Sequence, residues 1–207
     1  GYTKMINSEP VVYSGMYTSY TREQLIDLVK KKMSKKRFEH VLRVEKTAIQ
    51  LAREYAADVE KASIAALLHD VAKEQSEAEM RDIVISENLN LDLLQFGSQI
   101  WHAPVGSILA EREYGISDDE ILEAIKYHTI AAPEMSLIAQ IIFVADYIEP
   151  GRTHEAAKEA RKLASYSLRD AVRFEITQTI KYLVEKEERI YPSAIDAYNA
   201  WIERKMS

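Results

Sequence analysis

The sequence of 207 residues contains no cysteine. That absence excludes disulfides, thiolate metal sites, iron–sulfur clusters and cysteine nucleophiles, and it is compatible with a reducing cytoplasm. Glycine and proline are also scarce, with six and five residues respectively. Since the chain also has no repeat and no low-complexity tract, its composition is that of an ordinary folded domain.

The sequence lacks a long hydrophobic run. A membrane-spanning helix needs about 18 or more consecutive apolar residues. The best apolar runs here, Ile64–Leu68 and Ile141–Val144, are only long enough for a core. Nothing at the N-terminus has the pattern of a secretory signal. We therefore expect no membrane association.

Basic residues are in the minority. The chain has 27 lysines and arginines against 33 aspartates and glutamates, with a net charge of −6 and a pI near 5.5. Proteins that bind nucleic acid usually have a basic surface, so we expect no nucleic-acid partner. A local basic pocket for a phosphorylated small molecule is still compatible with this charge.

Apolar residues recur at helical spacing along nearly the whole chain from Thr21 onward. No segment shows the sustained period-two alternation of a half-buried strand. Residues 1–20 mix glycine, proline, serine and tyrosine without a period. The sequence predicts an irregular N-terminal arm over residues 1–20. Over residues 21–207 it predicts one all-α globular domain, a helical bundle of roughly nine or ten helices.

Cap signals divide this pattern into individual helices. Ser76–Glu79 and Ser117–Glu120 have the capping-box pattern, and Pro104 is placed as the first residue of a helix that ends near Gly115. The other predicted helices run from Thr21, from about Lys35 to Tyr55, from Asp58 to about Ala72, from Ser136 to about Ile148, over 154–188 with a break around Ser165, and over 193–205.

Only five histidines occur, and four of them lie on apolar helix faces or at helix starts, namely His40, His69, His102 and His128. Asp70 directly follows His69, and Asp146 interrupts the apolar run Ile141–Val144 and Ala145. A buried carboxylate is costly unless it is paired or binds a metal. The simpler alternative is that all these side chains are independent, hydrogen-bonded core residues.

A metal centre explains the six polar residues together. The predicted ligands of one ion are His40, His69, Asp70 and Asp146, and those of a second ion are His102 and His128, with Asp70 as a bridge. Imidazole and carboxylate groups suit iron, manganese, zinc or nickel. A bridging carboxylate suits two ions about 3.5–4 Å apart, an arrangement used to hydrolyse phosphate bonds.

The order His40, His69-Asp70 and Asp146 on successive helices resembles the HD-domain metal-dependent phosphohydrolases. Five motifs narrow the resemblance, which covers about residues 20–205, to the YqeK family. The motifs are Arg37-Phe38-Glu39-His40-Val41, His69-Asp70-Val71-Ala72-Lys73-Glu74, His102-Ala103-Pro104-Val105-Gly106, Tyr127-His128-Thr129 and Ala145-Asp146-Tyr147-Ile148-Glu149-Pro150-Gly151-Arg152.

The resemblance implies a bacterial, cytoplasmic enzyme that cleaves diadenosine tetraphosphate (Ap4A) symmetrically into two ADP. It also implies a di-iron-type centre, so iron is the first expectation for two divalent transition-metal ions. Asp70, as the bridging ligand, and Lys73 are then the expected catalytic residues, and Lys73 and Arg152 the expected phosphate contacts. His154 is a further candidate for phosphate binding or proton donation, against the simpler interpretation of a surface residue.

One departure from the family pattern follows Tyr127-His128-Thr129. A second threonine, a glycine and often a basic residue are expected there, but the chain has Ile130, Ala131 and Ala132. The histidine is kept, so the departure concerns substrate contacts more than metal binding.

Two other functions stay open at this point. One is a non-catalytic metal- and nucleotide-binding regulatory module, and the other is a purely structural helical protein. The oligomeric state is open too, with a tyrosine-rich arm that would add contacts in a homodimer.

Overall fold

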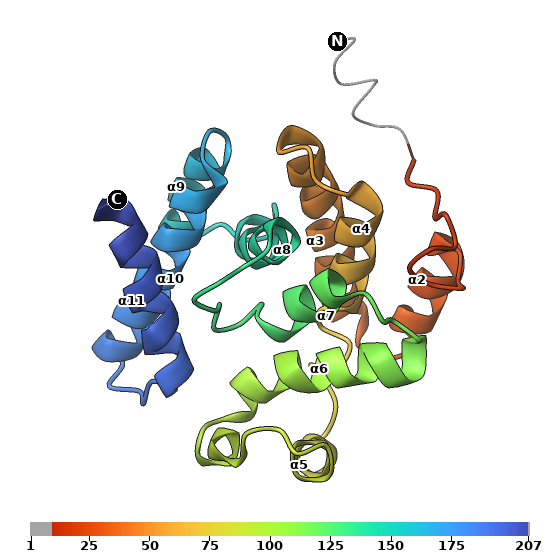
Figure 1. The fold of residues 1–207 in the computed structure, drawn as a ribbon, viewed down its shortest axis with the longest axis horizontal. Coiled ribbons are helices and arrows are strands. Elements are labelled where there is room, and N and C mark those ends of the chain that lie inside the picture. The colour runs from red at the N-terminus through yellow and green to blue at the C-terminus, as the bar shows by residue number, and fades with distance from the viewer. Residues whose placement is uncertain (1–9, 207) are drawn as a thin grey trace.

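Helix α8 (Leu137–Ile148) is the most apolar helix and lies at the centre of the structure (Figure 1). The structure is a computed structural model that describes residues 10–206. One side of α8 packs against α3 (Lys35–Glu54) and α4 (Val59–Leu68), and the other packs against α9 (Glu155–Ala164) and α10 (Leu168–Glu185). Eight of its 12 residues are buried, as expected of a helix enclosed by others.

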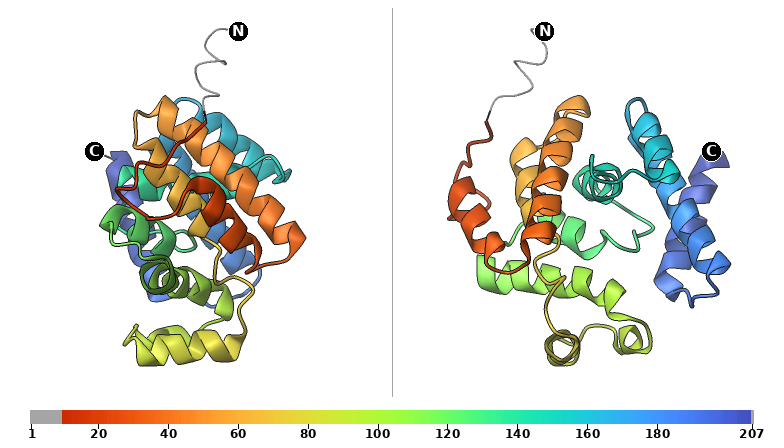
Figure 2. Two further views of the ribbon diagram at one scale, coloured as in Figure 1. Left: turned by 90° about the vertical axis from the view of Figure 1, so that its right-hand side faces the viewer. Right: turned by 180° about the vertical axis from the view of Figure 1, so that it is seen from behind.

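The remaining helices complete the layers around α8. Helix α2 (Arg22–Lys30) lies on the far side of the α3–α4 pair, and α11 (Pro192–Met206) packs along α10 (Figure 2). At one end, α5 (Glu77–Ser86), the 3-10 helix η1 (Leu91–Gln95) and α6 (Ser98–Tyr114) form a layer, which α7 (Asp119–Lys126) joins to α8.

Residues 10–206 contain ten α-helices and no strand, so the predicted all-α fold is confirmed. The break predicted around Ser165 separates α9 from α10. In the described part of the chain, no helix combines the length and apolar character needed to cross a membrane.

Side-chain caps define where several helices start. Ser34, Asp58, Ser76 and Ser136 each accept a hydrogen bond from the backbone N–H three residues later. The start predicted from Ser117–Glu120 is wrong by one residue, since the N-cap of α7 is Asp118. An aspartate caps at least as well as a serine, and its charge also suits the positive end of the helix dipole.

The helix start predicted at Pro104 is also wrong. Helix α6 begins at Ser98 with Gly97 as its N-cap, and Pro104 lies inside it. An internal proline removes a backbone hydrogen bond and costs about 3 kcal/mol. Burial of the large Trp101 side chain in the first turns offsets part of that cost. As a result, His102 lies within the helix and not ahead of it.

Helix α4 ends four residues before the predicted end at Ala72, and His69 occupies its C-cap. The chain then continues in turns, which are tied to the start of α3 because Ser34 donates to the Glu74 carboxylate through its N and Oγ atoms at 2.5 and 2.8 Å. Adjacent side chains on a helix diverge by about 100°. In this turn, His69 and Asp70 instead face one site.

Residues 10–20 contain no helix and lie against α4. The Tyr13 hydroxyl is 2.7 Å from the hydroxyl of Ser63, and Tyr17 donates to Asp58 at 2.7 Å. The first nine residues of the predicted arm lie outside the described residues. The division of the chain at residue 20 stays a prediction.

Candidate functional site

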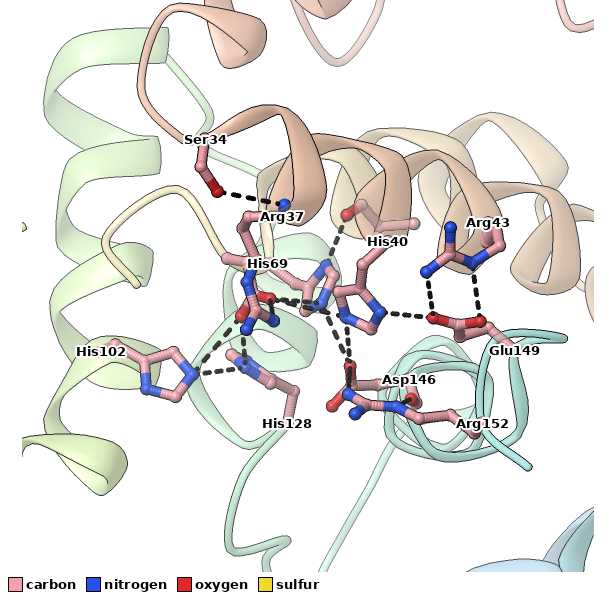
Figure 3. A network of polar contacts seen from close by, with 12 residues as sticks. Ser34, Arg37, His40, Arg43, His69, His102, His128, Asp146, Glu149 and Arg152 are labelled. Atoms are coloured by element: carbon pink, nitrogen blue, oxygen red, sulfur yellow. Dashed lines mark hydrogen bonds and ion pairs between the residues drawn. The ribbon is translucent and has the colours of Figure 1, made fainter. Parts of the chain in front are cut away.

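The six predicted metal ligands come together between α3, α4, α6, α7 and α8 (Figure 3). They are His40 on α3, His69 and Asp70 in the turn after α4, His102 on α6, His128 in the turn after α7, and Asp146 on α8. They form two groups in which the potential ligand atoms lie within 4.8 Å of one another, namely His40, His69, Asp70 and Asp146, and Asp70, His102 and His128. The two groups share Asp70, as the predicted metal centre requires.

The two carboxylate oxygens of Asp70 face different groups. Oδ1 lies 3.4 Å from Nε2 of both His102 and His128. Oδ2 lies 3.4 Å from Nε2 of His69 and 3.6 Å from Nε2 of His40. A carboxylate placed in this way is suited to bridge two cations.

Backbone carbonyls orient two of the imidazoles. Nδ1 of His69 lies 2.6 Å from the carbonyl oxygen of Ala66, and Nδ1 of His128 lies 2.8 Å from that of Ile125. Because a carbonyl oxygen only accepts, each Nδ1 carries the proton. In the neutral ring, the lone pair is then on Nε2, which faces the cluster.

The donor set fits metal ions. Nε2 of His69 is buried without a hydrogen-bond partner in the protein, and the Nε2 atoms of His102 and His128 are 3.1 Å apart. A buried nitrogen lone pair without a partner, as on Nε2 of His69, is unfavourable in a core, and a cation would satisfy it. Imidazole and carboxylate groups are ligands that divalent transition metals accept. The structure therefore contains a His/Asp cluster that would hold metal ions.

The histidines and carboxylates of the cluster shift one another's pKa values. Burial lowers the pKa of the His69 imidazole, but the carboxylates of Asp70 and Asp146 outweigh burial and raise this pKa to about 9. Burial raises the pKa of Asp70, but the charge of His69 and hydrogen bonds from His102 and His128 hold it well below its ordinary value. The negative charges of Asp70 and Asp146 therefore favour a positive charge between them.

Glu149 is a functional candidate that the sequence analysis missed. It is the C-cap of α8, and its side chain is 1% exposed. Its Oε2 lies 2.6 Å from Nδ1 of His40, and Arg43 donates to both of its carboxylate oxygens (Figure 3). Glu149 thereby orients His40, whose Nε2 lies 3.0 Å from Oδ1 of Asp146.

Two further residues complete the support around the cluster. The N–H of Gly151 donates to the Glu149 carboxylate. A Cβ atom at Gly151 would lie 2.6 Å from Glu149 Oε1 and 2.8 Å from Nε of Arg43, so a larger residue here would displace the Glu149–Arg43 pair. On the other side, Arg37 donates to Oδ2 of Asp70 at 3.0 Å. The sequence could have indicated the two supporting arginines through their spacing. Arg37 and Arg43 lie three residues before and after His40, so they lie on neighbouring turns of α3 on the same side as His40.

A cavity of about 770 Å³ lies over the cluster. His128 and Asp146 reach its wall. Asp146, which the sequence analysis expected to be buried, has a side chain that is 23% exposed because it faces this space. Lys73, one of the predicted phosphate contacts, lines the same cavity. Helix α10 and the connection to α11 supply much of the remaining wall.

The other two predicted phosphate contacts, Arg152 and His154, do not line this cavity. Arg152 donates through Nε to the carbonyl of Asp146 at 3.2 Å, and its Nη2 is 3.7 Å from the Asp146 carboxylate. Its side chain is 41% exposed. His154 is exposed beside the start of α9, with its ring edge-on to Tyr147, and it lines a hollow of about 370 Å³ that adjoins the cavity through Tyr147. The structure therefore does not bring His154 into the cavity over the cluster.

The departure after Thr129 has a structural explanation. Ile130 lines the cavity, whereas Ala131 and Ala132 are buried in the main core. Ala131 has φ of 62°, in the left-handed region where a glycine would be unstrained. The carbonyl of Ala132 accepts from Nε1 of Trp201 at 2.9 Å. A basic residue missing at position 132 therefore leaves no gap in the cavity wall.

Comparison with known proteins agrees with this geometry. The HD domain family matches residues 37–151, which contain all six clustered residues. The symmetrical bis(5'-nucleosyl)-tetraphosphatase of Bacillus subtilis (strain 168) is 41% identical over 181 residues, which are 87% of this chain and 97% of the relative. The corresponding protein of Staphylococcus aureus (strain NCTC 8325 / PS 47) is 42% identical over 174 residues, covering 83% and 90% of the two chains.

A solved structure shares the fold. The crystal structure of a predicted HD superfamily hydrolase involved in NAD metabolism, from Clostridium acetobutylicum, superposes with a TM-score of 0.85 at 36% identity. The match covers 89% of this chain and 98% of the other. On the family match and on the identity to relatives covered over nearly their whole length, the chain belongs to the HD-domain family and, within it, to the symmetrical bis(5'-nucleosyl)-tetraphosphatases of the YqeK type.

Proposed function

We propose that this protein hydrolyses Ap4A symmetrically to two ADP. The observation that carries the proposal is the position of Asp70, whose two oxygens face two histidine groups in a cluster that reaches a cavity through His128 and Asp146. Such a carboxylate suits a pair of metal ions acting on one phosphate chain. The two bacterial relatives described above are named for this activity.

The six clustered residues would hold two divalent ions, and we propose iron for them. When bound, such ions make hydroxide available from water near neutral pH and polarise phosphoryl oxygens. The residues of the chain prepare the site for this chemistry. Glu149 fixes the orientation of His40, and Arg37 holds the carboxylate of Asp70, which would contact both ions.

The proposed reaction consumes one water for each Ap4A. Its oxygen bonds to one of the two central phosphorus atoms, the bridging P–O bond between them breaks, and one ADP leaves while the other takes the oxygen. ADP is a weakly basic leaving group, so a strong general acid is not required. Lys73, which lines the cavity, would stabilise the charge on the phosphoryl oxygens.

The arrangement favours this enzyme over a non-catalytic module. The departure at residues 130–132, which suggested the alternative, leaves His128 in the cluster and Lys73 on the cavity wall. We propose that Arg152 approaches the outer phosphates, since its partly exposed guanidinium lies beside Asp146. Pairing of two copies and a cytoplasmic location stay predictions.

Product analysis tests this function. The protein, purified without chelator, is incubated with Ap4A in ¹⁸O-labelled water. The product nucleotides are then separated, and their masses are measured by mass spectrometry to find which of them contain ¹⁸O. We expect ADP alone, with one labelled molecule in two. The Asp70→Asn variant should be inactive, and Glu159→Gln, an exposed change on α9, should retain full activity. AMP together with ATP would contradict symmetrical cleavage, and bound but uncleaved Ap4A would support the regulatory alternative.

A further inference from the structure

Two buried polar atoms on the cavity wall have no partner in the protein. Oε1 of Glu175 and Oγ1 of Thr129 are both inaccessible and make no hydrogen bond. Glu175 is 5% exposed and lies on α10, and Thr129 lies in the turn that follows α7. Both residues line the 770 Å³ cavity. Since buried polar atoms in native proteins are nearly always paired, these two atoms indicate a ligand that supplies the missing hydrogen bonds.

The charged side chains near Glu175 indicate whether a phosphate or an uncharged hydroxyl group of a ligand would form a hydrogen bond with it. Burial and then the negative charge of Asp146 raise the pKa of Glu175 well above its ordinary value, and the positive charge of Arg152 only partly offsets them. A phosphate beside Glu175 would add negative charge to a wall that already carries Asp146. An uncharged hydroxyl avoids this repulsion, and because it both donates and accepts, it pairs with Glu175 in either protonation state.

The proposed substrate carries neighbouring hydroxyls only on its two riboses. Building on the proposed function, we infer that Glu175 binds the 2′- and 3′-hydroxyls of one ribose, with Thr129 as a further hydrogen-bond partner. Glu175 is then a specificity residue that selects ribonucleotides over deoxyribonucleotides. The selection is independent of the base, because both atoms contact the sugar.

Sugar-modified substrates test this role. The kcat/KM for Ap4A is compared with that for its analogue with two 2′,3′-dideoxyriboses. We expect the wild type to prefer Ap4A by about tenfold, the effect of one strong hydrogen bond. In Glu175→Ala the preference should fall below about twofold, mainly because Ap4A is used less well. Glu175→Gln and Thr129→Val should each retain part of the preference, and Glu159→Ala should retain all of it.

Binding of products tests the same role without turnover. Calorimetry with ADP and 2′,3′-dideoxy-ADP should show a preference for ADP that Glu175→Ala loses. An unchanged preference in that variant overturns the inference. Equal losses for both sugars would assign Glu175 to packing or phosphate binding, and a loss of bound metal would assign it to the cluster. If the wild type cleaves neither tetraphosphate, the proposed function fails, and the binding preference alone then decides the role of Glu175.

Discussion

Oε2 of Glu149 lies 2.6 Å from Nδ1 of His40, and these two residues link Arg43 to the His/Asp cluster. The carboxylate accepts from Arg43 on one side and fixes the imidazole on the other. Burial raises the pKa of Glu149, but hydrogen bonds from Arg43 and His40 outweigh it and lower this pKa. The carboxylate therefore stays ionised when it orients His40.

Replacing Glu149 with glutamine should weaken metal binding without unfolding the protein. The amide keeps the shape but loses the charge that holds His40, and loss of such a partner typically costs about 10–100-fold in metal affinity or activity. Titration with a competing chelator measures the affinity. The exposed variant Glu159→Gln serves as the control, and unchanged affinity in Glu149→Gln would show that His40 is positioned by packing alone.

Single substitutions should separate the two metal positions. Asp70→Ala removes the residue shared by both groups, so we expect it to abolish binding of both ions. His102→Ala removes a residue of one group only, and it should lower the metal content from two ions to one. Elemental analysis of protein purified without chelator measures this. Two ions retained in His102→Ala would contradict the two-ion arrangement.

Lys73→Ala should lower turnover by about 10–100-fold, because the variant loses one charge-assisted hydrogen bond to phosphate, worth about 1.5–3 kcal/mol. The factor should be similar for Ap4A and for diguanosine tetraphosphate, since both share the phosphate chain. Steady-state kinetics on the two substrates decides. An effect confined to one base would assign Lys73 to the nucleoside.

Glu175→Gln should stabilise the chelator-treated protein at neutral pH, because the amide removes the cost of ionising a buried carboxyl group near Asp146. The pKa of Glu175 is raised in the folded state, so its contribution to stability is greatest below the ordinary glutamate pKa and is lost as the pH rises toward the raised value. Thermal unfolding should therefore show the smallest advantage of the variant near pH 4 and a larger advantage as the pH rises above the ordinary glutamate pKa. An advantage that is constant with pH would show that ionisation is not its cause.

Ala131→Gly should change the free energy of unfolding by less than about 1 kcal/mol. Ala131 has φ of 62°, a conformation that costs a residue with a Cβ atom roughly 1–2 kcal/mol, and the greater unfolded-state entropy of glycine together with the loss of a buried methyl group offsets that gain. For a domain of this size the melting temperature should stay within about 4 °C of the wild type. Its neighbour provides the control, because Ala132→Gly removes a buried methyl group and should lower the melting temperature.

The sequence predicted those helices and site residues whose burial can be inferred from neighbouring residues in the chain. It did not predict those whose burial depends on residues far away in the sequence. His40 could be found because it is a polar residue on the apolar face of Val44, Ala48 and Leu51, all of which are buried. Glu149 could not, because at the end of α8 and beside Pro150 it has the pattern of a surface cap. Its burial depends on Arg43, 106 residues earlier in the chain.

Contacts with another element of the structure also explain why the predicted start of α6 was wrong. Proline is common at the first position of a helix, so the local signal favoured Pro104. The true start at Ser98 depends on Trp101, whose indole donates to the carbonyl of Leu93 in the neighbouring 3-10 helix. Glu175 was missed for a similar reason, since only the packed structure places α10 over the cavity.

The residues that would hold the metal ions and many of the residues that line the cavity lie in different parts of the chain, which affects how such enzymes can diverge. The six clustered residues all lie within residues 37–151, whereas about half of the residues that line the cavity lie within residues 175–194. Mutations in the second part would alter which ligand fits while leaving the ligands of the metal untouched. Evolution would thus be free to exchange the substrate of this scaffold without rebuilding its reactive centre.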